Sequence, residues 1–323
     1  MPAARGLVVV GGSAGAIEAL QTLAAGLPGD LPAAMLVVVH TRSTDSRLAR
    51  ILSRSGPLPA QMAAEGGRLV PGRIVVAAPN RHLVVRGSRV ALEYGPEENL
   101  ARPSIDVLFR SAAESHGAGV IGVVLSGTLD DGTAGLMAIR RAGGFTIVQD
   151  PEDALYSQMP ASALHFAHPD AVVPADELAK TVVAATQGLV DGTPEVPMRS
   201  DEQETTGAED QQGRLSGLTC PQCGGAMWED DSGGVLRFRC RTGHVLAQET
   251  MAAEQARMVE DAIYAALRAL EEQASLSRRL AARFRRRGED SLAARYERRA
   301  DDCIEQARVL RDSLLGEGPP EPH

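Results

Sequence analysis

Residues 8–20 read VVVGGSAGAIEAL: a run of valines, a turn of small residues around one serine, and the start of a helical pattern. Small residues let the chain bend sharply between a strand and a helix, and the first N–H groups of that helix favour negative charge. Residues 11–15 fit the pattern G-x-S-x-G, which would make Ser13 a nucleophile. Glycines in such a turn can also cradle a phosphate, so this stretch alone leaves two chemistries open.

Runs rich in Val and Ile alternate with helical patterns from residue 6 to about residue 185. Strands are expected at residues 6–10, 35–40, 73–78, 82–85, 90–94, 120–126 and 145–149. Near-continuous apolar runs are typical of strands that are buried on both faces of a parallel sheet. The order therefore predicts an α/β domain with a doubly wound, mostly parallel sheet. Residues 71–94 are expected to form a local β excursion, because their strands lie too close together for crossover helices.

Polar residues stand where the parallel strands are expected to end. Ser13 follows the first strand and His40 closes the second, so both should lie at the sheet edge where such folds build their sites. A histidine beside a serine is a natural general base.

A dinucleotide loop would need glycine in place of Val10 and an acidic residue in place of His40. The turn TLDDGTAGL offers Asp130 and Asp131, one as the acid of a triad and the other as a cap for the next helix.

Six stretches follow one another along residues 5–185. They are VVVGGSAGAIEAL, VVVH, PGRIVVAAPNRHLVV, RPSIDVLFRSAA, VIGVVLSGTLDDGTAGLMAIRRAGG and VQDPEDALYSQMPASAL. Together they resemble the catalytic domain of the CheB-type chemotaxis protein-glutamate methylesterases. Members of that family hydrolyse γ-glutamyl methyl esters on the cytoplasmic helices of methylated chemoreceptors, and often deamidate receptor glutamines. The resemblance implies that Ser13 is the nucleophile, His40 the base and Asp131 the acid, with Asp130 where asparagine is common.

The chain departs from the family pattern in three places. Ala14 stands where threonine is frequent, and Thr128 stands in place of a turn methionine whose backbone is held to help form the oxyanion hole. The resemblance implies that Gly12, Ala14 and Thr128 line the oxyanion site. The phosphorylated receiver domain of the family is not seen ahead of the first strand, so we do not expect control by phosphorylation within this chain.

A second motif lies behind the α/β pattern. Cys220 and Cys223 form a C-x2-C knuckle, and after sixteen residues Cys240 and His244 form a second one. Two knuckles of this kind typically complete a tetrahedral structural zinc site. Such a closed site has no open position, so this metal is not expected to take part in catalysis, and no other cofactor is expected for catalysis. Cys303 is expected to pack within a helix.

Four segments are expected along the chain. They are the catalytic domain (residues 1–190), a flexible acidic linker (191–216), a zinc-ribbon-like module (217–246) and a helical hairpin (247–316). Gly288 should end the first helix of the hairpin. Apolar residues at helical spacing in both helices favour packing against each other, self-association or binding of a partner.

Bulk properties exclude several classes of protein. The net charge of −9 over 323 residues does not favour nucleic-acid binding, and no apolar run approaches the ~20 residues that span a bilayer, so the chain is not expected to be membrane-inserted. Clustered cysteines without an export signal favour the cytoplasm. Two alternatives to a receptor methylesterase stay open: a non-catalytic regulatory or scaffolding protein of a chemosensory pathway, and an esterase or amidase of the same mechanism that acts on another substrate.

Overall fold

The computed structural model describes residues 6–40, 47–188, 213–231 and 234–316. The chain divides into two compact units, Met1–Met251 and Ala252–His323. The first unit holds the α/β domain together with the cysteine module, and the second holds most of the two C-terminal helices.

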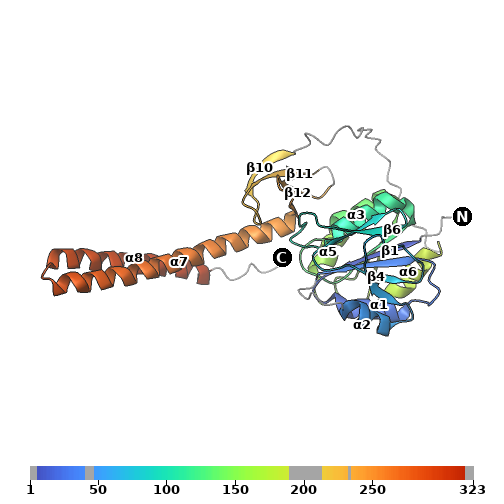
Figure 1. Ribbon diagram of the computed structural model, residues 1–323, viewed down its shortest axis with the longest axis horizontal. Coiled ribbons are helices and arrows are strands. Elements are labelled where there is room, and N and C mark those ends of the chain that lie inside the picture. Colours follow the sequence, from blue (N-terminus) through green and yellow to red (C-terminus); the bar gives the residue numbers. More distant parts are fainter. Residues whose placement is uncertain (1–5, 41–46, 189–212, 232–233, 317–323) are drawn as a thin grey trace. The chain divides into compact units, whose positions relative to one another are not determined.

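Seven parallel strands form the central sheet in the order β3-β4-β2-β1-β7-β8-β9 (Figure 1). These strands are β1 (Leu7–Gly12), β2 (Ala34–Val39), β3 (Ala60–Met62), β4 (Ile74–Val76), β7 (Val120–Val124), β8 (Phe145–Gln149) and β9 (Ala171–Val173). The chain starts in the middle of the sheet, builds outward on one side through β2, and later continues on the other side of β1 through β7. The predicted doubly wound fold is therefore confirmed, and its topological switch point lies at β1.

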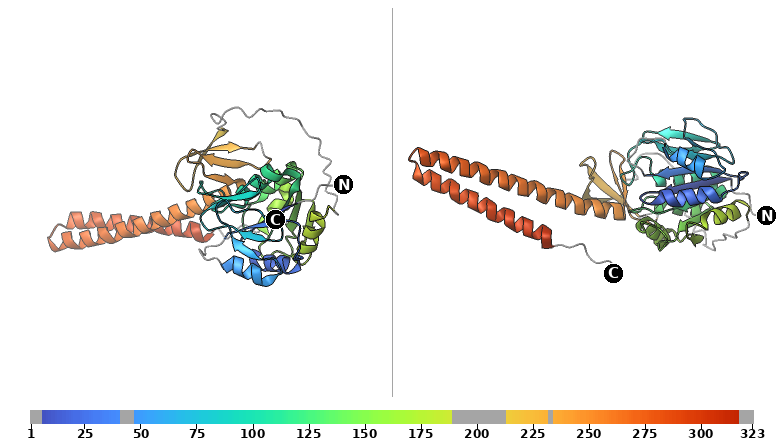
Figure 2. Two further views of the ribbon diagram at one scale, coloured as in Figure 1. Left: turned by 45° about the vertical axis from the view of Figure 1, so that its right-hand side comes forward. Right: turned by 90° about the horizontal axis from the view of Figure 1, so that it is seen from below.

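Helices cover both faces of the central sheet (Figure 2). They are α1 (Ala16–Gly26), α2 (Arg47–Ser55), α3 (Ile105–His116), α4 (Thr133–Arg141), α5 (Gln158–Ala167) and α6 (Leu178–Thr186), with a 3-10 turn at Gly117–Gly119. Val8 and Val10 pack into the core that α1, α2 and α6 complete. Leu7 and Val9 pack into the core of α3, α4 and α5 on the opposite face. Successive side chains of a strand point to opposite faces, which explains why β1 is apolar at every one of these positions.

The predicted β excursion is correct only in part. β5 (His82–Arg86) and β6 (Arg89–Glu93) form a separate antiparallel pair, as expected. β4, however, joins the central sheet beside β2, because α2 supplies the crossover between them. The sequence patterns did not predict α2, α5, α6, β3 or β9. The strands β3 and β9 have only three residues each, which is too short to show a hydrophobic period.

A small antiparallel sheet of four strands forms the cysteine module. Its strands, in spatial order, are β10 (Arg214–Thr219), β11 (Ala226–Asp230), β12 (Arg237–Cys240) and β13 (Val245–Ala247). β13 also bridges to Glu98 of the α/β domain, just before α3. Most of the expected linker, residues 191–212, lies outside the residues that the structure describes.

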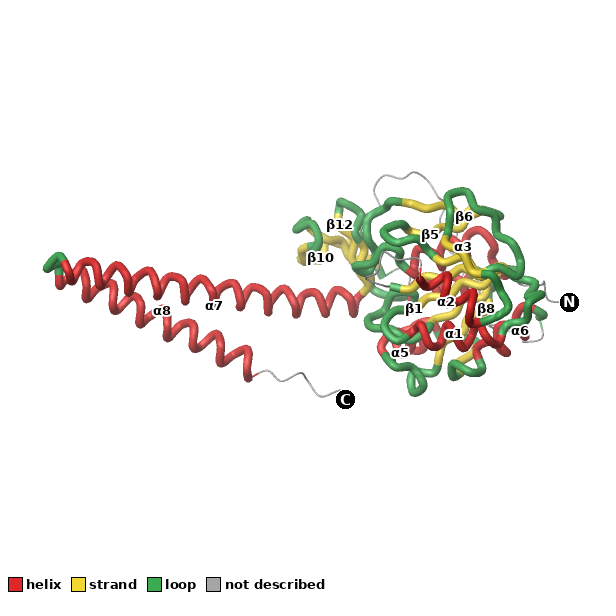
Figure 3. Tube along the Cα trace, turned by 60° about the horizontal axis from the view of Figure 1, so that its bottom comes forward, coloured by secondary structure: helices red, strands yellow, loops and turns green. Residues whose placement is uncertain are grey.

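The second unit is an antiparallel helical hairpin, as the sequence predicted (Figure 3). It consists of α7 (Gln248–Arg286), from residue 252 onward, and α8 (Asp290–Gly316). Gly288 takes a φ of 73° between the helices, a conformation that glycine adopts at little cost. The buried positions along the hairpin include four small side chains that let the helices approach closely: Ala274, Ala281, Ala293 and Ala300. None of the described helices is both long enough and apolar enough to cross a membrane.

Candidate active site

The ends of β1 and β2 bring Ser13 and His40 to one point. Gly12 and Val39 are partners in the parallel register, so the residues that follow them leave the sheet side by side. The His40 N–H donates to the Gly12 carbonyl at 3.1 Å, and the Ser13 N–H donates to the Ser126 carbonyl at 3.0 Å. Gly12 must be small here, because a Cβ at this position would lie 2.5 Å from that of Ala16.

The side chains of His40 and Asp131 lie together across the end of β1. His40 Nε2 is 2.9 Å from Asp131 Oδ2, and the two side chains are 21% and 3% exposed. An acid beside Nε2 favours the tautomer that carries its proton there, which leaves Nδ1 to act as a base. Among the described residues the Ser13 hydroxyl makes no hydrogen bond with His40, although the two residues are neighbours. Such contacts are often long in enzymes without substrate.

Asp131 is held from several sides at the start of α3. It accepts hydrogen bonds from the Ile105 N–H at 2.7 Å, the Asp106 N–H at 3.2 Å, the Ser104 hydroxyl at 2.9 Å and the Asn99 amide at 3.0 Å. Burial opposes ionisation, but His40 and these donors outweigh it, so the pKa of Asp131 lies below its ordinary value. Asp131 is thus a buried, ionised carboxylate in a fixed orientation.

A second buried carboxylate, Asp106, binds the start of α4 in the way that Asp131 binds the start of α3. It lies in α3 and accepts from the N–H groups of Gly132 at 3.0 Å and Gly135 at 2.6 Å, at the start of α4. Asp131, just before α4, in turn accepts from the start of α3. Burial first, and then the charge of Asp131, raise the pKa of Asp106 to about 7. The two carboxylates cap each other's helices, and they differ in their proton affinity.

Asp130 has a role that differs from the one expected. Its carboxylate accepts from the Thr250 hydroxyl at 2.6 Å and the Glu249 N–H at 3.2 Å, at the start of α7. Burial raises its pKa despite these bonds. We expected one acid of the pair to cap the helix that follows it in sequence. The cap of α4 comes from Asp106 instead, and Asp130 caps α7.

Two backbone N–H groups beside Ser13 are open. In the described part of the chain, the N–H groups of Ala14 and Thr128 have no hydrogen-bond partner. Ser126 shapes this region, because its hydroxyl donates to the Ala14 carbonyl at 2.8 Å and accepts from the Tyr156 N–H at 2.9 Å. Ser13 is also close to the second turn, since a Cβ at Gly127 would lie 2.9 Å from that of Ser13. Free N–H groups of this kind can stabilise an oxyanion.

Sequence reasoning missed several buried polar residues of this region, including Ser104 and Asp106. Ser126 holds the turn, as described above, and its N–H donates to the Gln149 side chain at 2.9 Å. Asn99 contacts Asp131 and Asp106. A signal for Ser126 and Gln149 existed, because each is a polar residue at the end of an apolar strand run, after β7 beside β1 and in β8 beside β7. Asn99 lies in a loop and carried no such signal.

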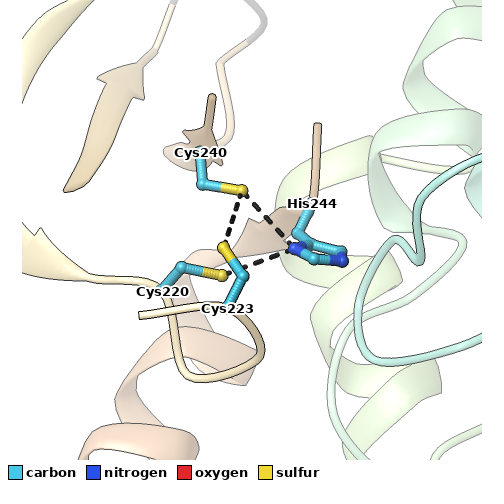
Figure 4. Close-up of side chains that lie close together, drawn as sticks. All are labelled: Cys220, Cys223, Cys240 and His244. Carbon is cyan, nitrogen blue, oxygen red and sulfur yellow. Dashed lines mark hydrogen bonds between the residues drawn. The ribbon is translucent and has the colours of Figure 1, made fainter. Parts of the chain in front are cut away.

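The four predicted metal ligands come together in the small sheet (Figure 4). Cys220 Sγ and Cys240 Sγ lie 3.7 Å and 3.5 Å from His244 Nδ1, and Cys223 Sγ lies 3.6 Å from Cys240 Sγ. The edges of a tetrahedron around zinc would measure about 3.5 Å between sulfur and nitrogen and about 3.8 Å between two sulfurs, given bonds of about 2.3 Å to sulfur and about 2.0 Å to nitrogen. These side chains, called the Cys3His cluster below, therefore fit a tetrahedral metal ion.

A serine on a strand-to-helix turn, with a histidine and a carboxylate at the same sheet edge, is the arrangement of serine-dependent hydrolases. Residues 8–182 match the CheB methylesterase family, and the chain belongs to that family. This confirms the resemblance seen in the sequence.

Relatives and a solved structure agree with this assignment. The chain is 40% identical over 181 residues to protein-glutamate methylesterase/protein-glutamine glutaminase 1 of Anaeromyxobacter dehalogenans, which covers 55% of this chain and 52% of that protein. It is 36% identical over 181 residues to protein-glutamate methylesterase/protein-glutamine glutaminase 4 of Geobacter metallireducens, which again covers 55% of this chain and 52% of that protein. The CheB methylesterase catalytic domain of Thermotoga maritima superimposes with a TM-score of 0.54 at 28% identity, covering 56% of this chain and 98% of that one. The chain spans about half the length of the curated relatives it matches.

Proposed function

We propose that this protein hydrolyses γ-glutamyl methyl esters on methyl-accepting chemoreceptors, with Ser13 as nucleophile, His40 as general base and Asp131 as the acid that orients His40. The observation that carries the proposal is the pair of His40 and Asp131, 2.9 Å apart, at the strand end next to Ser13. Membership of the CheB methylesterase family supports the same reaction.

The reaction is an acyl transfer in two stages. His40 Nδ1 takes the hydroxyl proton of Ser13 as Oγ attacks the ester carbonyl carbon, and the N–H groups of Ala14 and Thr128 receive the oxyanion. The bond from carbon to the methoxy oxygen then breaks, and His40 returns its proton to form methanol. Water attacks the acyl-enzyme with His40 again as base, which releases the glutamate side chain and restores Ser13.

A mainly apolar cleft at the end of β2 supports a protein substrate. It has a volume of about 260 Å³, and its lining includes Ile17 at the start of α1, Val39 at the end of β2, and Arg102. Apolar walls suit an uncharged ester and the helix that carries it. Methylated receptor helices, with glutamates near the modified residues, are therefore the substrate class that we propose.

Deamidation of receptor glutamines is a second candidate activity. The relatives in Anaeromyxobacter and Geobacter are named for both reactions. The same acyl-enzyme would form from a primary amide, with ammonia leaving in place of methanol after protonation by His40. Both reactions belong to the cytoplasmic side of a receptor, which is where we place the protein.

The Cys3His cluster is proposed to hold structural zinc. Its four ligand atoms fit a closed tetrahedral site, and the hydroxyl of Thr242 donates to Cys223 Sγ at 3.6 Å, which favours the thiolate. Zinc bound there would supply cross-linking of β10–β13 and no chemistry at Ser13.

The test is methanol release from methylated receptor fragments. Wild-type protein should release methanol, and Ser13→Ala should lower the rate by at least about a thousandfold, because the acyl-enzyme forms on the Ser13 hydroxyl oxygen. Ser88→Ala is the matched control, since Ser88 is exposed in the turn between β5 and β6. Equal rates for wild type and Ser13→Ala would sink the mechanism, and no release by wild type would favour the scaffolding alternative.

A further inference from the structure

One buried side chain, Asn99, joins the proposed active site to the small sheet. Its Nδ2 atom donates to Asp131 Oδ1 at 3.0 Å and to Asp106 Oδ2 at 3.1 Å. Its Oδ1 atom accepts from the Ala247 N–H at 2.8 Å. The side chain is thus fully paired, with both of its amide hydrogens directed at carboxylates and its oxygen directed at β13.

The contacts of Asn99 leave the amide only one orientation. The ionised carboxylate of Asp131 can accept hydrogen bonds but cannot donate them, so the amide nitrogen must face Asp131 and the oxygen must face away. The oxygen then needs a donor at a buried position, since Asn99 is only 7% exposed. Ala247 of β13 supplies that donor.

The backbone of Asn99 is held by the same strand. Its N–H donates to the Val245 carbonyl at 2.8 Å, and its φ of 52° lies in the left-handed region that asparagine tolerates better than most residues. Val245 directly follows the predicted ligand His244, whose carbonyl accepts from the Cys240 N–H at 3.0 Å. The path from the Cys3His cluster to Asp131 therefore runs through one strand and one side chain.

We infer that Asn99 is a positioning residue for Asp131, and that a metal ion in the Cys3His cluster holds β13 and thereby holds Asn99 in place. This inference rests on the proposed function, because it assigns Asp131 to the hydrolytic site. By this inference the metal centre of the small sheet supports the orientation of Asp131, the carboxylate that faces His40.

Two consequences separate this role from a purely structural one. Asn99 touches no substrate, so its loss should lower kcat and leave KM unchanged. Asp131 would also lose one of the donors that keep its pKa low, so the acid limb of the pH–rate profile should move to higher pH. The other charged groups near Asp131, which both variants below retain, are His40, Asp106, Asp130, Arg110 and Glu98.

The variant that tests this is Asn99→Gly. Glycine keeps the left-handed backbone and the bond to Val245, and removes only the amide. We expect kcat to fall about tenfold or more, as for a lost hydrogen bond to a charged group. Thr250→Val is the matched control, because it removes a buried bond at the same junction that ends on Asp130. It should leave the acid limb in place.

Chelation of the metal tests the link to β13. Zinc removal from the wild type should lower kcat by the same factor as Asn99→Gly, and should add little in the Asn99→Gly protein, since both changes break one path. Equal losses on chelation in both proteins would overturn the link, and a wild-type kcat and acid limb in Asn99→Gly would overturn the positioning role.

A readout without substrate separates this inference from the proposed function. The imidazole protons of His40, whose Nε2 lies 2.9 Å from Asp131 Oδ2, can be followed by NMR, with His40→Gln to assign the signal. We expect the signal to shift or broaden in Asn99→Gly and on chelation, and to stay in Thr250→Val. If wild type releases no methanol, the proposed function fails while the NMR comparison still decides the role of Asn99. An unchanged signal in Asn99→Gly would refute that role.

Discussion

The α/β domain and the small sheet of β10–β13 hold their functional side chains by different means. Asp131 is 3% exposed and accepts four hydrogen bonds at the edge of a sheet with a core on each face. The core of the small sheet contains six buried residues, and two of them, Cys220 and Cys240, are ligands of the Cys3His cluster. Three of these four donors lie at the start of α3 and come with the fold of the α/β domain, whereas we expect the small sheet to need its ion.

The largest expected effect is the response of the two regions to loss of the metal. Chelation should unfold β10–β13 and leave the central sheet intact, because zinc binding in small domains is worth about 10–16 kcal/mol and there is little apolar core to replace it. Amide hydrogen exchange should show protection lost in β11 and β12 and kept in β1 and β7.

Matched variants sharpen this test. Cys240→Ser removes a ligand and should behave like chelation, whereas Cys303→Ser changes a buried cysteine of the helical hairpin and should not. Protection in β11 and β12 that survives chelation would contradict the comparison, because the small sheet would then be stable through its own packing.

A smaller effect concerns the pH dependence of the α/β domain. Burial raises the pKa of Asp106 to about 7, above its unfolded value of 3.8. Between these two values the folded protein keeps a proton that the unfolded chain has released, so stability falls as the pH rises through this window. From pH 5 to pH 8 the free energy of unfolding should therefore decrease by on the order of 1–3 kcal/mol through this group.

This contribution of Asp106 to the free energy of unfolding can be measured by denaturant unfolding of wild type and Asp106→Asn at pH 5 and pH 8. The variant cannot ionise at that position, so its stability should vary less with pH, whatever its absolute stability is. Asp130, whose pKa is also raised, is common to both proteins and cancels in the comparison. Identical pH slopes would mean that Asp106 ionises as readily in the folded protein as in the unfolded chain.

The sequence predicts the sheet of the α/β domain and the ligands of the Cys3His cluster, but not the residue that joins the two regions. The apolar runs of β1, β2 and β7 predict a parallel sheet because each of these strands is buried on both faces. The spacing of the cysteines predicts the ligand set because both knuckles are local. Asn99 could not be predicted, since its partners lie 7, 32 and 148 residues away and are brought to it only by the fold. The roles of Ser13, His40 and Asp131 stay predictions from the family pattern.

The smallest expected effect compares a second contact between the two regions. Gln222, between two ligands of the Cys3His cluster, donates from an exposed position to Glu97, which lies two residues before Asn99. Water can replace this hydrogen bond, whereas nothing replaces the buried bonds of Asn99. Gln222→Ala should change the free energy of unfolding by less than about 0.5 kcal/mol and leave the metal content and methanol release unchanged. A loss comparable to that of Asn99→Gly would show that the exposed face of the junction, and not its buried amide, connects the small sheet to the hydrolytic site.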